Sequence, residues 1–229
     1  MTATTFTGLL LIIVPILFNV AFFMLQRSFS YPDILRQPTD AILRRFQAGG
    51  RPLRRLWYGF AFTSLIFIPV PVLLHQLFGP AAPWYLAPAT VLGVLAGLVQ
   101  VLGLLRWSFL VPSLAELYTR PDSSPATRDS AAVVFQAFHQ YAGVALGEHL
   151  GYMFTGLWSL LVSLAIIQTA FVPPLLGWLG LIPALGILVG LLEEAGFKSA
   201  GLINALSYIL WSLWLIAFGI ALLLRVGAF

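Results

Sequence analysis

The sequence predicts an all-α protein, a polytopic bundle of helices embedded in a membrane. Hydrophobic residues make up 60% of its 229 residues and charged residues only 9%, and the mean hydropathy is +0.95. A soluble domain carries about 25% charged residues, so a soluble globular protein is excluded. The apolar residues fall into runs of about 20, the length a helix needs to cross a hydrocarbon core about 30 Å thick. We therefore expect one integral membrane domain over residues 1–229, with about six transmembrane helices.

Polar or proline-rich segments separate the expected transmembrane spans. These spans cover about residues 5–25, 56–78, 85–107, 148–171, 179–194 and 202–224. The first basic residue, Arg27, follows the first apolar run, whereas a signal peptide has its basic residues before the run. Residues 5–25 are therefore expected to be a span. Pro69 and Pro71 should bend the outer half of the second span, because proline lacks the N–H of a helical hydrogen bond.

The segment from Gln26 to Leu56 holds seven of the twelve basic residues and only two acidic ones, Asp33 and Asp40. Short arginine-rich loops stay on the cytoplasmic side of a membrane, so both chain termini are expected outside. This distribution explains the net charge of +4 without a nucleic-acid partner. Start signals at Pro38–Asp40 and stop signals at Gly49–Gly50 predict a short amphipathic helix lying on the inner leaflet.

The apolar run from about Ala131 to Val172 is too long for one span. Its roughly 40 residues would reach about 60 Å as a helix, twice the thickness of the hydrocarbon core. It is either one span with a long inner extension or two spans joined within Gly147–Gly151. These five residues contain no proline or turn dipeptide. We therefore favour one span preceded by a long amphipathic or apolar helix on the cytoplasmic side.

Glycines recur four residues apart in spans three, four and five. Small residues at this spacing let two membrane helices approach closely. The expected close contacts are inside the chain, with other membrane helices, or with a second copy of the chain. The glycines assigned to helix packing are Gly93, Gly97, Gly143, Gly147, Gly151, Gly186 and Gly190.

Glu148 is the strongest candidate for a functional residue. It stands beside His149 within this glycine pattern, and ionisable groups at membrane depth are rare, paired and often functional. Tyr141, Glu148, Tyr152, Thr155 and Ser159 recur at a period near 3.5, which predicts a polar stripe along one side of a helix. The stripe should face the bundle interior or a water-filled cavity. Interhelical hydrogen bonding that only fixes packing is the alternative.

Counting residues along the spans suggests partners for Glu148. Arg106 ends span three and would keep the Glu148 carboxylate ionised. Glu193 and Glu194 end span five at the same expected cytoplasmic level, although Glu194 could instead pair with Lys198 four residues later. The candidate ligand or proton sites are Glu148, His149, Arg106, His139, Tyr152, Glu193 and Glu194.

A metal site is not expected. His139, Glu148, His149 and one of the carboxylates of Glu193 and Glu194 are ligand types that zinc or iron accepts. However, His139 and Glu148 are nine residues apart, which places them on opposite sides of an α-helix. The sequence has no cysteine and no nucleophile, phosphate-loop or nucleic-acid motif. It leaves catalytic residues and cofactors undetermined.

Three short motifs resemble a bacterial membrane family known only as a domain of unknown function, family 4386. They are Gly147-Glu-His-Leu-Gly151, Leu157-Trp-Ser-Leu160 and Tyr208-Ile-Leu-Trp-Ser-Leu-Trp214. The resemblance implies a multi-span protein of the bacterial inner (plasma) membrane without an assigned activity. It supplies no catalytic residues.

Three functions fit these observations. The first is a membrane protein that binds or moves a small or hydrophobic solute at a polar site around Glu148. The second is an accessory subunit that docks partner helices on its glycine seams. The third is an intramembrane enzyme with Glu148 and His149 as an acid–base pair. Membrane lipid is an expected partner in each case.

Overall fold

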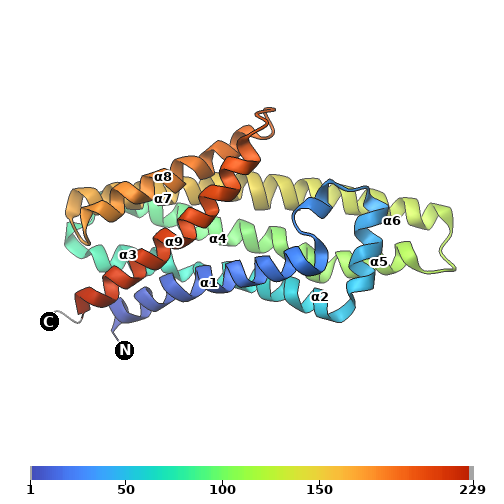
Figure 1. Ribbon diagram of the computed structural model, residues 1–229, viewed down its shortest axis with the longest axis horizontal. Coiled ribbons are helices and arrows are strands. Elements are labelled where there is room, and N and C mark those ends of the chain that lie inside the picture. Colours follow the sequence, from blue (N-terminus) through green and yellow to red (C-terminus); the bar gives the residue numbers. More distant parts are fainter. Residues whose placement is uncertain (1, 227–229) are drawn as a thin grey trace. The chain divides into compact units, whose positions relative to one another are not determined.

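A computed structural model describes residues 2–226, which form helices joined by short turns and contain no strand (Figure 1). The helices are α1 (Ala3–Phe29), η1 (Asp33–Arg36), α2 (Thr39–Phe67), α3 (Pro69–Phe78), η2 (Gly79–Ala81), α4 (Leu86–Phe109), α5 (Val111–Thr119), α6 (Pro125–Phe138), η3 (His139–Leu150), α7 (Gly151–Thr169), α8 (Pro174–Val189), η4 (Gly190–Leu192) and α9 (Ala200–Val226).

Six helical segments of the described chain are long and apolar enough to cross a membrane. They are Ala3–Phe29, Thr39–Ala81, Leu86–Thr119, Pro125–Thr169, Pro174–Leu192 and Ala200–Arg225. The prediction of an all-α membrane bundle with six spans is therefore confirmed.

Two breaks in the second segment follow from single residues. Gly50 has φ 56° and ψ −150° inside α2, a left-handed conformation that glycine adopts without a steric penalty. It ends an amphipathic helix that begins at Thr39, where the sequence predicts one. The second break lies at Ile68, after which Pro69 begins α3, because proline is tolerated in the first turn of a helix.

The central apolar run is helical without interruption from α6 through η3 to α7, so residues 147–151 form no hairpin. Its middle part, η3, is a π-helix of 12 residues, although π-helical hydrogen bonds usually occur as single turns. A π-helix has more residues per turn than an α-helix. Residues that recur at a period near 3.5 therefore do not lie on one side of it. The stripe predicted from a 3.5-residue period is therefore wrong at Tyr141, whose side chain is 65% exposed while Thr155 and Ser159 are buried.

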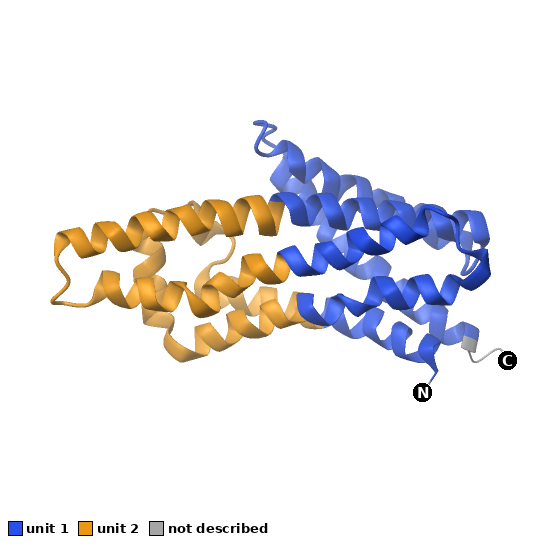
Figure 2. Ribbon diagram, turned by 180° about the vertical axis from the view of Figure 1, so that it is seen from behind, with its two compact units in different colours: residues 1–16, 64–99, 149–229 blue, residues 17–63, 100–148 orange. Residues whose placement is uncertain are grey.

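The described chain divides into two compact units, whereas the sequence predicts one domain over residues 1–229. Unit 1 comprises residues 1–16, 64–99 and 149–229, and unit 2 comprises residues 17–63 and 100–148 (Figure 2). Each unit has its own core of buried apolar residues.

Unit 1 joins its helices through polar groups that find partners on neighbouring helices. α8 packs against both α7 and α9. Trp211 Nε1 donates a hydrogen bond to Ser159 Oγ (2.7 Å), and Asn204 Nδ2 donates one to the Ile187 carbonyl (3.0 Å). Trp214 Nε1 donates to the Leu176 carbonyl at 2.8 Å. These bonds tie α7 to α9 and α8 to α9.

The predicted packing glycines of unit 1 lie against side chains of the same unit. A Cβ atom on Gly93 would lie 2.5 Å from Pro71 Cγ, and one on Gly97 would lie 2.7 Å from Ile68 Cγ1. Gly186 faces Ser207 and Gly190 faces Asn204 in the same way. These glycines therefore serve contacts inside the chain.

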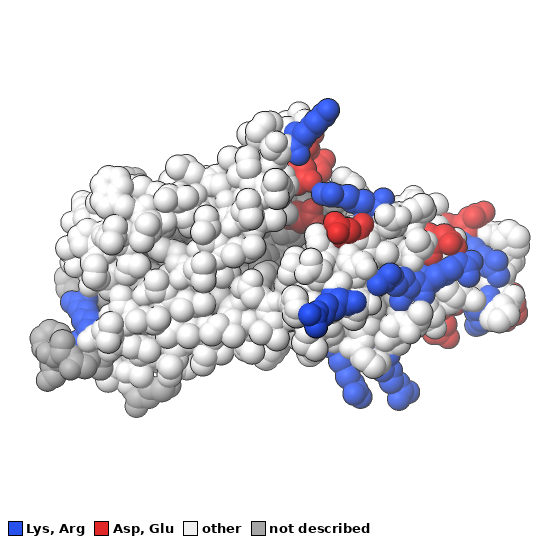
Figure 3. Space-filling model, in the orientation of Figure 1, with Lys and Arg blue, Asp and Glu red and all other residues white. Residues whose placement is uncertain are grey.

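Unit 2 has an aromatic core. The rings of Trp57 and Trp107 are stacked, with centroids 4.7 Å apart and planes at 11°. Phe29 meets Trp107 edge-on at 5.4 Å, and Phe135 meets it at 6.0 Å. Unit 2 also holds ten of the twelve basic and six of the eight acidic residues. Figure 3 shows charges of unit 2 over α2, α5 and α6, and a smaller group of charges, at the turn before α9, belongs to unit 1.

Candidate functional site

A buried arginine, Arg106, lies at the centre of the polar groups of unit 2. Its side chain, on the last turn of α4, is only 9% exposed. The guanidinium Cζ lies 5.3 Å from the centre of the Trp107 ring, and Nη1 donates a hydrogen bond to the Gly103 carbonyl one turn earlier. A second donor, Nε, has no partner among residues 2–226. A buried cation needs compensating groups, and two other residues, Tyr31 and Glu148, act on it electrostatically.

Glycines bring α4 and η3 together at this point. A Cβ atom on Gly143 would lie 2.5 Å from Arg106 Nη2, so a larger residue here would displace the guanidinium. A Cβ on Gly103 would lie 2.8 Å from both the Ala142 carbonyl oxygen and Gly147 Cα. The two helices therefore meet backbone to backbone between Gly103 and Gly147. Sequence analysis missed Gly103 because it belongs to no four-residue glycine pair.

Tyr31 and Glu148 share the electrostatic environment of Arg106. Tyr31 lies in the turn between α1 and η1, and its pKa is raised above the usual 10.0. Burial is the largest cause, the negative charge of Glu148 adds to it, and the positive charge of Arg106 opposes it. Glu148 is half-buried, and its charge also acts on Arg106. The expected association of Glu148 with Arg106 thus includes a tyrosine that sequence analysis missed.

His139 belongs to the same group. It begins η3, where its ring stacks on Phe135 with centroids 5.7 Å apart and planes at 6°. Arg106 acts electrostatically on this ring. Sequence analysis placed His139 and Glu148 on opposite sides of an α-helix, but that geometry does not hold in a π-helix, which has more residues per turn. His139, Gly143 and Glu148 follow each other at intervals of four and five residues and all three act on or contact Arg106.

We call Arg106, Tyr31, His139 and Glu148 the Arg106 centre. No group of three or more acidic or histidine side chains within the described residues could hold a metal ion.

Buried polar atoms without a hydrogen-bond partner gather in unit 2. Most buried polar groups in folded proteins have a partner. Within residues 2–226, seven buried side-chain atoms lack one, and six of them belong to unit 2. These six are Trp57 Nε1, Arg106 Nε, Trp107 Nε1, Ser108 Oγ, Arg128 Nε and His139 Nδ1. The seventh is Ser163 Oγ of unit 1.

The other predicted site residues lie in unit 1. His149, Glu193 and Glu194 are exposed. Tyr152 packs its ring 5.8 Å from the ring of Tyr208 and lies beside Gly190. Residues after η4 form turns instead of a helix, so the helical pair considered for Glu194 and Lys198 is wrong. Gly151 is buried at the start of α7.

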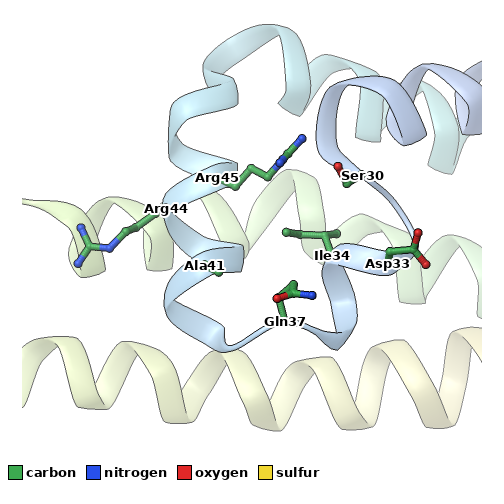
Figure 4. A pocket seen from close by; sticks show the side chains of 7 residues that line it. All are labelled: Ser30, Asp33, Ile34, Gln37, Ala41, Arg44 and Arg45. Atoms are coloured by element: carbon green, nitrogen blue, oxygen red, sulfur yellow. The ribbon is translucent and has the colours of Figure 1, made fainter.

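Unit 2 also carries two surface hollows, and neither is lined by a residue of the Arg106 centre. The first, of about 620 Å³, is lined by Ser30, Asp33, Ile34, Gln37, Ala41, Arg44 and Arg45. In Figure 4 the side chain of Arg44 points away from the other lining residues. Its Nε donates a hydrogen bond to Asp40 at 2.6 Å.

Comparisons with known proteins place the chain in a family. Neither the curated proteins nor the solved structures give a significant match. The family model described as "Domain of unknown function (DUF4386)" matches residues 6–219, and this range includes all of unit 2, most of unit 1 and every residue of the Arg106 centre. The chain belongs to this family of proteins of unknown function, as the motifs around Glu148 and Trp211 predicted.

Proposed function

We propose that this integral membrane protein binds or moves a small or hydrophobic solute at the Arg106 centre. The single observation that supports the proposal most is the lack of hydrogen-bond partners, among residues 2–226, at Arg106 Nε, His139 Nδ1 and the indole nitrogens of Trp57 and Trp107. If these groups served only helix packing, we would expect them to be paired, as the tryptophans of α9 are in unit 1. Buried polar groups without partners are costly, and a bound solute would offset that cost.

The donors of unit 2 favour a particular solute chemistry. Arg106 Nε, Trp57 Nε1 and Trp107 Nε1 can only donate hydrogen bonds, so they suit oxygen acceptors. The surrounding aromatic rings supply apolar contact area. The preferred solute therefore has an oxygen acceptor, such as a carboxylate, on an apolar body.

Glu148 would keep this site in a state that accepts the solute. Its negative charge acts on Arg106 and compensates part of the charge of the buried guanidinium. A neutral amide at this position would remove that compensation with little change in side-chain size. We therefore expect Glu148→Gln to lose the bound solute.

The two other interpretations gain less support. The glycines of the proposed docking seams contact groups of their own chain at Gly93, Gly97, Gly143, Gly147, Gly186 and Gly190. An acid–base pair of Glu148 with His149 is disfavoured because neighbouring residues of a helix do not face each other. Partner helices or a second copy of the chain would have to bind through other surfaces.

We further infer that the protein lies in the bacterial inner membrane with both termini outside. Ten basic residues in unit 2, seven of them between Gln26 and Leu56, support this orientation. Protease or dye access to a tag at each terminus in spheroplasts tests it. A tag protected at either end would contradict the proposed topology.

A comparison of compounds that copurify with the protein tests the solute proposal. Wild-type protein and Glu148→Gln are purified in mild detergent and their bound small molecules analysed by mass spectrometry. Glu193→Gln, a change of the same kind at an exposed site, is the matched control. We expect a compound retained by the wild type and the control to be lost from Glu148→Gln, which should remain folded at the temperature of purification. Equal retention by all three proteins would overturn the proposal.

A further inference from the structure

We propose that the second surface hollow of unit 2 binds the phosphate group of an anionic phospholipid. The hollow has a volume of about 490 Å³ and is lined by Arg51, Arg54, Arg55, Tyr58, Ser108 and Phe109. It is separate from the Arg106 centre, so the proposal does not depend on the solute function.

The basic side of the hollow begins directly after the break at Gly50. Beyond it, α2 continues with Arg51. Arg54, Arg55 and Tyr58 follow Arg51 by three, four and seven residues. Residues at this spacing lie on one face of a helix. Three guanidinium groups therefore project from one face at the start of the apolar part of the second span.

The three arginines are free to bind an anion. Arg51, Arg54 and Arg55 are exposed, and no carboxylate lines this hollow. The salt bridges Arg44–Asp40 and Arg120–Asp122 of the described residues do not include these three arginines. The first hollow, by contrast, includes Asp33, whose charge would repel a phosphate. Guanidinium groups match phosphate oxygens in charge and in bidentate geometry.

Ser108 supplies an independent indication of a ligand. Its side chain is only 2% exposed, it lines the hollow from the end of α4, and its Oγ has no hydrogen-bond partner among residues 2–226. A buried hydroxyl without a partner is uncommon. A phosphate oxygen held by the arginines would accept a hydrogen bond from it.

Exposed aromatic side chains favour a lipid over free phosphate. Tyr58 is 51% and Phe109 is 63% exposed, and their rings meet edge-on at 6.2 Å. Phe62, one turn further along α2, is 47% exposed. Basic groups at the end of an apolar helix, followed by such aromatic surface, suit a headgroup and the upper part of its acyl chains.

Lipid titration of the full-length protein in detergent tests the proposal. The probes are dioleoyl phosphatidylglycerol and inorganic phosphate, with binding followed by native mass spectrometry and thermal unfolding. The test variant is Arg51→Gln/Arg54→Gln/Arg55→Gln. The matched control, Arg27→Gln/Arg36→Gln/Arg45→Gln, removes the same charge and leaves this hollow intact.

We expect the wild type and the control to bind phosphatidylglycerol. The test variant should bind it about a hundredfold more weakly, because each of the three arginines contributes about fivefold to the affinity. Ser108→Ala should weaken binding several-fold while leaving the lipid-free melting temperature unchanged, so it decides the question if the triple variant fails to fold. Inorganic phosphate should neither bind nor compete at the same concentration. Equal lipid binding by Ser108→Ala and the wild type would overturn the site, and full competition by inorganic phosphate would overturn the lipid as its occupant.

Discussion

The two units of this protein use their buried polar side chains differently. In unit 1, the indoles of Trp211 and Trp214 and the amide of Asn204 hydrogen-bond to neighbouring helices. In unit 2, the indoles of Trp57 and Trp107 lack such partners among the described residues, although both rings are fully buried. The same residue type therefore secures packing in one unit and leaves free donors in the other.

The contrast between paired and unpaired polar groups indicates where to look for function in a membrane protein without an assigned activity. Polar residues within membrane helices are expected to pair, because lipid offers no hydrogen bonds. Pairing identifies groups whose role is structural. Unpaired polar atoms beside a buried charge mark a candidate site, and in this protein Arg106 Nε and His139 Nδ1 of the Arg106 centre meet that criterion among the described residues.

Of the changes considered, removing the charge of Arg106 should lower the stability of the protein most. Arg106→Met keeps most of the side-chain volume but leaves Glu148 without its counter-charge. We expect a loss of about 3 kcal/mol in unfolding free energy, since breaking one side of a buried ion pair costs 3–5 kcal/mol and Glu148 is only half-buried. Thermal or denaturant unfolding in detergent measures it. Adding Glu148→Gln should recover part of the loss, and a purely additive double variant would show that the two residues are not coupled.

Filling the contact between Gly103 and Gly147 in unit 2 should have the second-largest effect on stability. Gly103→Leu would push a side chain against the Ala142 carbonyl and Gly147 Cα, which are backbone atoms. Overpacking costs about 1–3 kcal/mol, and we expect the upper part of this range. Gly59→Leu is the control, because a Cβ on Gly59 meets no atom within 4 Å. Equal melting temperatures for the two variants would mean that α4 and η3 do not touch at this point.

Removing a hydrogen bond from unit 1 should lower the unfolding free energy by a smaller amount. Trp211→Phe removes the donor to Ser159 Oγ, and the expected loss is about 1 kcal/mol. Trp84→Phe, at a site 84% exposed, should change stability little. If Trp211→Phe leaves unfolding unchanged while Trp57→Phe lowers stability by losing a bond, the contrast between the units is reversed.

The smallest effect concerns pH. Folding raises the pKa of Tyr31 above 10.0, chiefly through burial, so the folded state favours the neutral phenol. The stability that this shift contributes is present below pH 10 and is lost as the pH rises above it. Melting temperatures between pH 8 and 11 should therefore fall more steeply for the wild type than for Tyr31→Phe. Tyr58→Phe, at an exposed tyrosine, should follow the wild-type curve.

Much of the fold follows from the sequence because its physical causes are local. Run lengths predict the six spans, and the turn residues near Gly50 and Pro69 predict the breaks in the second segment. The association of Glu148 with Arg106 follows from counting residues along neighbouring spans. Each of these inferences needs only the helix rise and the thickness of a bilayer.

The remainder depends on a feature that residue spacing does not reveal. The π-helix η3 changes the number of residues per turn, so the face that carries His139, Gly143 and Glu148 does not follow the α-helical period. Tyr31 and Gly103 join the site only through tertiary contacts with distant segments. The functions of the exposed candidates His149, Glu193 and Glu194 remain predictions.

A density map of the protein purified in native lipid tests the central claim most directly. The region to inspect is the one around Arg106 Nε and the indole nitrogens of Trp57 and Trp107. The solute proposal predicts non-protein density within hydrogen-bond distance of Arg106 Nε, and its loss from a map of Glu148→Gln. A map in which protein groups or isolated ordered waters satisfy these donors, with Glu148→Gln unchanged, would contradict it.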